Sequence, residues 1–221
     1  MGCSGNIEEY DKKRQLPLRG SKISKNSNTD FSFEKQIINN NDNLQQNIII
    51  NISKNRNNIE DSILLNKKKK YINIMHEKHL HFRNLHGCSN NLCLEDSLNE
   101  LAQEYAKKLI NSPNHIYYNN YTYKGEALGE NIEISEGKIN PEEICNKWYK
   151  ESEIYKYANK FQKETVHFTQ IVWNNTKKVG FGFEMKDNIY SVVALYYPAG
   201  NIFNEFDKNV GKKIKDKKNS K

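Results

Sequence analysis

Residues 166–176, with the sequence VHFTQIVWNNT, constrain the fold more than any other segment of this chain. Residue types that favour strands dominate its first eight positions, and Asn-Asn-Thr supplies turn chemistry at its end. We therefore expect a buried strand over residues 166–173. This strand would begin beside an ionisable imidazole, His167, and a histidine at the start of a core strand needs either a hydrogen-bond partner or a chemical role.

The residues around this segment predict a sheet with helices packed against it. Capping patterns mark helix starts at Ser97, which has Glu three positions later, and at Asn140, which precedes proline and two acids. Hydrophobic spacing favours helices there, whereas alternation on both sides of a Lys-Asp-Asn turn favours strands. The predicted helices cover residues 71–86, 97–111 and 140–151, and the further strands cover residues 179–184 and 189–196. Helices followed by a strand meander indicate an α+β fold in which helices cover a sheet.

The 221 residues divide by composition into three parts. Residues 1–66 are rich in Asn, Lys, Ser and Asp and contain almost no aromatic side chains. Such a segment buries too little apolar surface to offset its ordering entropy, so we expect a disordered N-terminal extension. Residues 67–208 contain nearly all of the Trp, Tyr and Phe and form the predicted domain, and residues 209–221 form a basic C-terminal tail.

The formal net charge of +7 raises the question of a nucleic-acid partner. The lysines gather at residues 67–70 and 212–218, on either side of the aromatic region. Neither a nucleic-acid-binding motif nor zinc-finger spacing accompanies them, so we expect no nucleic-acid partner. The basic runs are either solvated tails or segments attracted to an anionic membrane surface, and the N-terminus favours the membrane.

The first residues, MGCS, provide a candidate lipidation site. Removal of Met1 would expose Gly2 to myristoylation, and Cys3 beside it is a palmitoylation candidate. Asn6 departs from the usual pattern, which has Ser or Thr at that position. Two acyl chains anchor a protein firmly, whereas one chain holds it only marginally. The alternative is a chance Met-Gly start, with Cys3 an ordinary exposed thiol.

Cysteine usage and hydropathy both favour a cytosolic protein. Beyond Cys3 the chain has Cys88, Cys93 and Cys145, an odd number for a disulfide framework. The first 20 residues lack the apolar core of a signal peptide, and no apolar stretch is long enough to span a bilayer. We therefore expect the protein at the cytoplasmic face of a membrane, at the Golgi, another endomembrane or the plasma membrane, and not secreted.

Five short motifs occur in an order that resembles the CAP superfamily, which contains the cysteine-rich secretory, antigen five and pathogenesis-related proteins. They are HLHFR at 79–83, GEN at 129–131, KWYKE at 147–151, HFTQIVWNNT at 167–176 and YYPAGN at 196–201. Leu80 stands where Asn is usual, and Ala194 stands where secreted members usually carry a cysteine. The chain is thus most similar to the intracellular, Golgi-associated branch. The resemblance implies a three-layer α-β-α sandwich.

The resemblance also implies a cleft that gathers two histidines and two acids. By motif position and chain order these are His115, Glu130, Glu151 and His167. Two imidazoles and two carboxylates provide ligands for Zn²⁺ or a similar ion. The same four side chains would equally form a closed hydrogen-bonded network that holds no ligand.

Catalysis by this cleft would need further groups. Hydrolysis of an acyl bond requires a nucleophile or a firmly held metal, together with oxyanion donors. The chain has no Gly-x-Ser-x-Gly motif and no cysteine in a catalytic pattern. A metal-dependent hydrolase is therefore the alternative, and a protein that is not an enzyme is favoured.

Lipid binding is the function that the resemblance favours. Members of the superfamily are implicated in binding sterols, fatty acids and acidic phospholipids, with the sterol site under an aromatic loop. Here that loop is residues 155–161, with Tyr155, Tyr157 and Phe161 as the predicted lipid contacts, although ordinary packing of Tyr157 and Phe161 is the alternative. We predict a membrane-tethered protein that binds sterol or anionic phospholipid. A protein-interaction scaffold at the membrane, including a homodimer, is the remaining alternative.

Overall fold

The computed structural model describes residues 30–88, 91–115 and 120–214, and side chains from residue 43 onward. The candidate lipidation residues Gly2 and Cys3 lie outside the described residues. The chain forms two compact units, residues 1–57 and 58–221. The candidate sites described below all belong to the second unit.

Helix α1 (Asp30–Leu85) begins far earlier than the helix predicted over 71–86, and it ends one residue before that predicted end. Residues 30–66 are helical where an extension without regular structure was expected, because no proline or glycine interrupts the chain from residue 30 to 85. Residues 43–67 are all exposed, so this part of α1 buries as little as its composition predicted. Tyr71 and Ile72 are the first apolar side chains of α1 that are partly buried against the core, and Met75 is completely buried.

The main sheet has four strands in the order β1-β5-β6-β4. Their bounds are Cys93–Leu94 for β1, Gly129–Glu136 for β4, Lys178–Lys186 for β5 and Ile189–Tyr197 for β6. Short β1 runs parallel to β5, and the other pairs are antiparallel. Asp187 and Asn188, both at positive φ, make the tight turn between β5 and β6, which confirms the predicted hairpin. Strands β2 (Thr122–Tyr123) and β3 (Glu126–Ala127) form a separate small pair.

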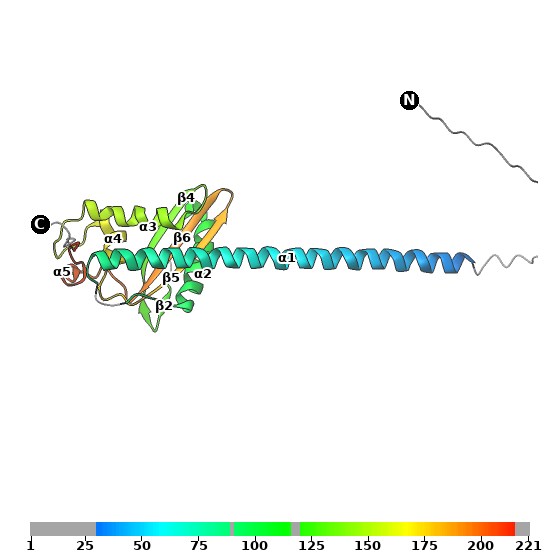
Figure 1. Cartoon of the computed structure of the whole chain (residues 1–221), viewed down its shortest axis with the longest axis horizontal. Coiled ribbons are helices and arrows are strands. Elements are labelled where there is room, and N and C mark those ends of the chain that lie inside the picture. Colours follow the sequence, from blue (N-terminus) through cyan, green and yellow to red (C-terminus); the bar gives the residue numbers. More distant parts are fainter. Residues whose placement is uncertain (1–29, 89–90, 116–119, 215–221) are drawn as a thin grey trace, which may run out of the picture. The chain divides into compact units, whose positions relative to one another are not determined.

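Helices cover both faces of this sheet (Figure 1). Helix α2 (Asp96–Asn111) packs on one face against Val193 and Leu195 of β6. On the other face lie the last turns of α1, α3 (Pro141–Lys150) and α4 (Val166–Ile171), around a core that includes Phe168 and Tyr196. The fold is therefore the predicted α+β, three-layer α-β-α sandwich.

Glycine residues let α2 lie directly on strand β5. A Cβ atom on Gly180 would come within 2.2 Å of the Leu98 backbone, and one on Gly182 within 2.2 Å of the Ala102 backbone. Asn99 Oδ1 then accepts from the Phe181 N–H at 2.8 Å, so the close approach also satisfies a backbone donor of β5.

The helix starts were predicted with mixed success. Asn140 caps α3 as expected, accepting from the N–H groups of Glu142 and Glu143. The capping box predicted at Ser97 is wrong, because α2 begins at Asp96 and the Ser97 hydroxyl instead donates to the Glu95 carboxylate at 3.1 Å.

The strand predicted over 166–173 is also wrong, since residues 166–171 form helix α4. Phe168, Ile171 and Val172 are completely buried, and their spacing of three and four residues puts them on one face of a helix. Strand preference was a poor guide here because tertiary contacts, described below, hold this short helix at both ends.

The C-terminal part of the chain packs on the domain beyond the boundary predicted at residue 208. Helix α5 (Phe206–Asn209) is followed by Val210, which is 4% exposed. The N–H of Ile214 donates to the carbonyl of Leu85 at 2.8 Å, so the chain is joined to the end of α1 as far as residue 214. None of the helices in the described part of the chain is both long and apolar enough to cross a membrane.

Candidate functional site

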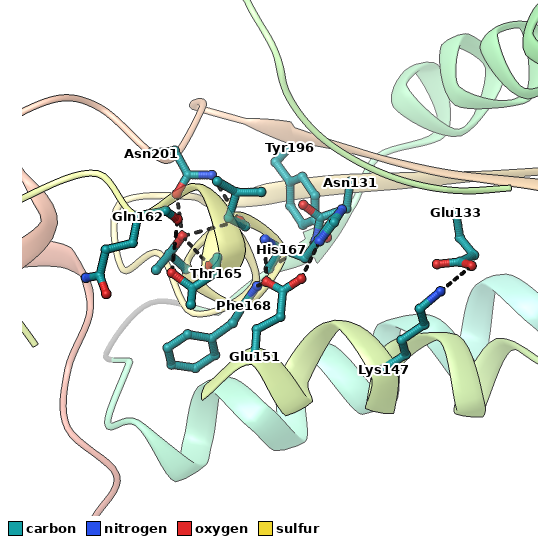
Figure 2. Close-up of polar contacts among 12 residues, drawn as sticks. Asn131, Glu133, Lys147, Glu151, Gln162, Thr165, His167, Phe168, Tyr196 and Asn201 are labelled. Carbon is teal, nitrogen blue, oxygen red and sulfur yellow. Dashed lines mark hydrogen bonds and ion pairs between the residues drawn. The ribbon is translucent and has the colours of Figure 1, made fainter. Parts of the chain in front are cut away.

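Glu151 and His167 form the centre of the site (Figure 2). Glu151 opens the short 3₁₀ helix η2 (Glu151–Glu153) that continues α3, and His167 lies in the first turn of α4. His167 Nδ1 is 2.6 Å from Glu151 Oε1. The side chains of Glu151 and His167 are 20% and 31% exposed, so the pair lies at the surface of the core rather than inside it.

The Glu151 carboxylate also caps α4. Its Oε2 accepts from the N–H of His167 at 2.9 Å and from the N–H of Phe168 at 3.0 Å. These are second- and third-position amides of the helix, which a capping side chain normally satisfies, and Thr165 at the N-cap makes no such bond. A negative charge at this end is also favoured by the helix dipole. Glu151 therefore performs an N-cap function from another element.

A buried network of hydrogen bonds next to His167 connects four elements, and Figure 2 shows its members Asn131, His167 and Tyr196. Asn131 Nδ2 on β4 donates to the His167 carbonyl and to the Tyr196 hydroxyl, each at 3.1 Å. Tyr196 in turn lies 2.7 Å from His79 Nε2, while His79 Nδ1 lies 2.7 Å from the Met75 carbonyl. Because a carbonyl only accepts, Nδ1 carries the proton and Tyr196 donates to Nε2.

Burial keeps both His79 and Tyr196 uncharged. Complete desolvation lowers the pKa of His79 to about 3, so the imidazole is neutral near pH 7. The same burial raises the pKa of Tyr196 well above its usual value. Both groups are neutral hydrogen-bonding members of the core, with no charge available for chemistry.

Arg83 holds the other end of α4. Its Nη1 donates to the carbonyls of Ile171 and Trp173 at 3.1 and 2.7 Å, and its Nη2 donates to that of Thr176 at 3.0 Å. A cation at a helix C-terminus complements the dipole and the last carbonyl groups. Arg83 belongs to the HLHFR motif, but nothing in that motif predicts this role.

The four residues of the predicted quartet come from different elements, and the contact between Glu151 and His167 is the one described above. Glu151 and His167 are bonded, whereas Glu130 is an exposed residue of β4 next to Asn131, whose side chain points to α4. Neighbouring side chains of a strand point to opposite faces. His115 ends the 3₁₀ helix η1 (Pro113–His115) at a φ of 54°, and its Nδ1 is buried without a hydrogen-bond partner among the described residues.

The described residues bring no set of zinc ligands together. Within the described part of the chain no three His, Cys, Asp or Glu side chains are grouped so that they could hold a metal ion. Glu151 also uses both carboxylate oxygens for the cap and for His167. Zinc sites need three or four protein ligands, so the predicted role of His115, Glu130, Glu151 and His167 in metal binding stays a prediction.

The glycines of the remaining motifs make room for Gln170. Gln170 Oε1 accepts from the Gly200 N–H at 2.9 Å, and its Nε2 donates to the Thr176 hydroxyl at 3.3 Å. A Cβ atom on Gly129 would lie 2.2 Å from Gln170 Oε1. Gln170 thus joins the segment around His167 to the YYPAGN segment by a hydrogen bond and by close packing.

The predicted aromatic loop presents two of its three aromatic rings to solvent. Tyr155 is 6% exposed and packs edge-on against Phe168 at 5.4 Å between ring centroids, so it anchors the loop in the core, while part of its surface lines the pocket described next. Tyr157 and Phe161 are 41% and 49% exposed. A pocket of about 280 Å³ lies between this loop and the chain around α5, with Tyr157 and Phe206 among its lining residues.

An amide side chain closes the same loop. Gln162 Oε1 accepts from the Lys156 N–H at 3.0 Å, and Gln162 Nε2 donates to the Lys156 carbonyl at 2.7 Å. Both backbone groups of Lys156 are therefore satisfied by one side chain, as they would be by a neighbouring strand. The loop between Lys156 and Gln162 is held in shape by these two bonds. No motif in the sequence predicts this role of Gln162.

The sandwich and its polar contacts define a domain in which the motifs hold a short helix between a sheet and two longer helices. The sequence profile of the Cysteine-rich secretory protein family (CAP) matches residues 76–197, more than half of the chain, and the chain belongs to this family.

Two curated relatives and one solved structure illustrate the likeness. Golgi-associated plant pathogenesis-related protein 1 of Homo sapiens is 35% identical over 145 residues, which cover 64% of this chain and 92% of that protein. Protein PRY2 of Saccharomyces cerevisiae is 32% identical over 131 residues, 58% of this chain but only 37% of PRY2. Schistosoma mansoni venom allergen-like protein 4 gives a TM-score of 0.49 at 21% identity, over 66% of this chain and 96% of that chain.

Proposed function

We propose that this protein is a lipid-binding module at the cytoplasmic face of a membrane, with sterol or anionic phospholipid as its ligand class. The observation that carries the proposal is the closed loop 156–162, which exposes Tyr157 and Phe161 beside a pocket. Aromatic rings held on a fixed loop offer apolar contact area with little rotamer entropy to lose on binding.

The membrane location is supported by separate features. Gly2 and Cys3 would attach acyl chains to the N-terminus, and two chains are needed for stable anchoring. Cys88, Cys93 and Cys145 are all free thiols, which suits a reducing compartment. A human relative carries the words Golgi-associated in its name.

Vesicle flotation of the full-length, unacylated protein tests the proposal directly. Phosphatidylcholine vesicles containing either phosphatidylserine or cholesterol separate the two ligand classes. We expect Tyr157→Ala and Phe161→Ala each to weaken binding severalfold, while Met185→Ala, which removes a side chain of similar exposure near the β5–β6 turn, leaves it unchanged. Equal binding by all four proteins would exclude the loop as the lipid contact.

One observation supports a second function. The imidazole of His167 is partly exposed and bonded to a carboxylate, which is how a general base is oriented for hydrolysis. This reading needs His167→Ala to abolish turnover in an esterase or peptidase screen without lowering stability. We favour lipid binding because Glu151, the orienting acid, is already engaged in capping α4.

A further inference from the structure

A turn directly after the YYPAGN segment carries an apolar side chain that the core does not use. The Glu205 N–H donates to the Ile202 carbonyl at 3.1 Å and closes a four-residue turn, with Phe203 and Asn204 at its central positions. Asn204 has a φ of 62°, a conformation that asparagine tolerates at the third position of a turn. The turn chemistry therefore comes from Asn204 and requires nothing of Phe203.

Phe203 is 71% exposed, the highest value of any large hydrophobic side chain among the described residues. Single exposed apolar residues are common, so exposure alone carries no conclusion. Ile202 beside it is 44% exposed, however, so the turn presents two adjacent apolar side chains.

The turn is held rigidly at both of its ends. On one side Asn201 Oδ1 accepts from the Thr169 hydroxyl at 2.5 Å and Asn201 Nδ2 donates to the Val166 carbonyl at 3.0 Å, as Figure 2 shows above α4. On the other side Phe206 is 1% exposed, and its N–H donates to Asn159 Oδ1 at 3.1 Å. Phe203 thus projects from a backbone that is already fixed, so binding costs little further conformational entropy of the backbone.

The same contacts place the turn next to the aromatic loop. Asn159, which accepts from Phe206, belongs to the loop 156–162, and the Phe161 ring lies 6.4 Å from the Phe206 ring between centroids. We call residues 154–164 and 201–214 together the two-loop surface. It presents Phe203 and Ile202 on one loop, and Tyr157 and Phe161 on the other.

The charge of the two-loop surface indicates which partner it suits. Its two segments contain six lysines and three acids. All six lysines are exposed, namely Lys156, Lys160, Lys163, Lys208, Lys212 and Lys213. Lysines around exposed aromatic and aliphatic side chains match a bilayer surface, where apolar groups enter the headgroup boundary and ammonium groups contact anionic lipids.

We propose that the turn Ile202–Glu205 is a second membrane contact, in which Phe203 enters the boundary between headgroups and acyl chains of an anionic bilayer. The surrounding lysines bind the headgroups. This inference rests on the proposed function, because it adds a second loop to the same lipid-binding surface.

Partition of the full-length, unacylated protein onto mixed phosphatidylcholine and phosphatidylserine vesicles measures the contribution of Phe203. We expect Phe203→Ser to lower the partition coefficient about tenfold, since it removes most of the apolar area that the turn can bury. Met185→Ser, at the end of β5 away from the two loops, is the matched control. It should change the partition coefficient by less than about twofold, because an exposed apolar side chain that stays in water contributes little to binding. Thermal unfolding should be unchanged for both variants because both side chains are exposed.

Depth of insertion is read from a tryptophan placed at the turn. Phe203→Trp on vesicles with brominated acyl chains should be quenched, whereas Met185→Trp should not. The two natural tryptophans, Trp148 and Trp173, are each 1% exposed and so are shielded from the bilayer in both variants. Quenching that is equal in the two variants would overturn the insertion of Phe203.

The outcomes separate this inference from the proposed function. Loss of partition with Tyr157→Ala but not with Phe203→Ser overturns the second contact and leaves the loop 156–162 in place. Loss of partition with Phe203→Ser but not with Tyr157→Ala supports the contact by Phe203 and excludes the loop 156–162 as a lipid contact. No binding of the unmutated protein to any vesicle overturns both. Unchanged vesicle partition together with loss of a protein partner by Phe203→Ser would overturn the membrane contact and make the turn a protein-docking site.

Discussion

Replacing Glu151 by alanine should destabilise the domain through helix α4. The change removes two hydrogen bonds from backbone amides to a carboxylate, at 2.9 and 3.0 Å, and the contact with His167 at 2.6 Å. Hydrogen bonds to charged groups contribute about 1.5–3 kcal/mol each. Because the three bonds share one carboxylate that is 20% exposed, they do not add, and we expect the free energy of unfolding to fall by about 3 kcal/mol.

The conservative variant separates geometry from charge. Glu151→Gln keeps an oxygen for the two amides and can donate to His167 Nδ1 once the imidazole changes tautomer. It loses only the negative charge at the helix N-terminus, which corresponds to about 1 kcal/mol.

Urea unfolding of the full chain, followed by circular dichroism, gives these differences. Glu153→Ala is the matched control, because Glu153 lies in the same 3₁₀ helix and is exposed. If Glu151→Ala and Glu153→Ala lowered stability equally, the capping role would be refuted. Added Zn²⁺ should leave the unfolding midpoint of the unmutated protein unchanged, whereas a metal bound at Glu151 and His167 would raise it by mass action.

Three further outcomes follow from contacts described above. Gly182→Ala should lower the free energy of unfolding by at least about 2 kcal/mol in the same urea assay, because its Cβ would lie 2.2 Å from the backbone of Ala102. Burial lowers the pKa of His79 to about 3, so below about pH 6.5 the unfolded chain binds a proton that the folded chain does not. The free energy of unfolding should therefore fall by up to about 1.4 kcal/mol per pH unit between about pH 6.5 and 5. His79→Gln should reduce this slope in the same urea assay. Gln162→Ala should open the loop at Lys156 and weaken vesicle binding severalfold without changing the unfolding midpoint, and unchanged binding would show that loop closure is irrelevant.

Local patterns predicted the elements whose causes are local. Asn140 caps α3 because its own neighbours supply the donors, and the β5–β6 hairpin forms around two residues that tolerate positive φ. Helix α4 could not be predicted in this way. Its cap comes from Glu151, 16 residues earlier, and its C-terminal partner Arg83 is 88 residues from Ile171.

The residues of the candidate site also differ in how far local sequence could predict their roles. Motif positions named both Glu151 and His167, and a contact of 2.6 Å joins their side chains in the structure. Glu130 was assigned by its place in the GEN motif and His115 by chain order alone, and their orientation depends on the alternation of β4 and on a loop. The roles of Gln162 and Asn201 had no sequence signal beyond an amide side chain, since each bonds to backbone groups whose positions only the fold determines.

The two charges at the ends of α4 have a consequence for the order of folding. A helix of six residues is not stable alone, since isolated helices shorter than about 12 residues are marginal in water. α4 can persist only after α1 has delivered Arg83 and α3 has delivered Glu151, so it should be among the last helices to form and the first to open in hydrogen exchange. The segment around His167 is then the part of the domain that docks last.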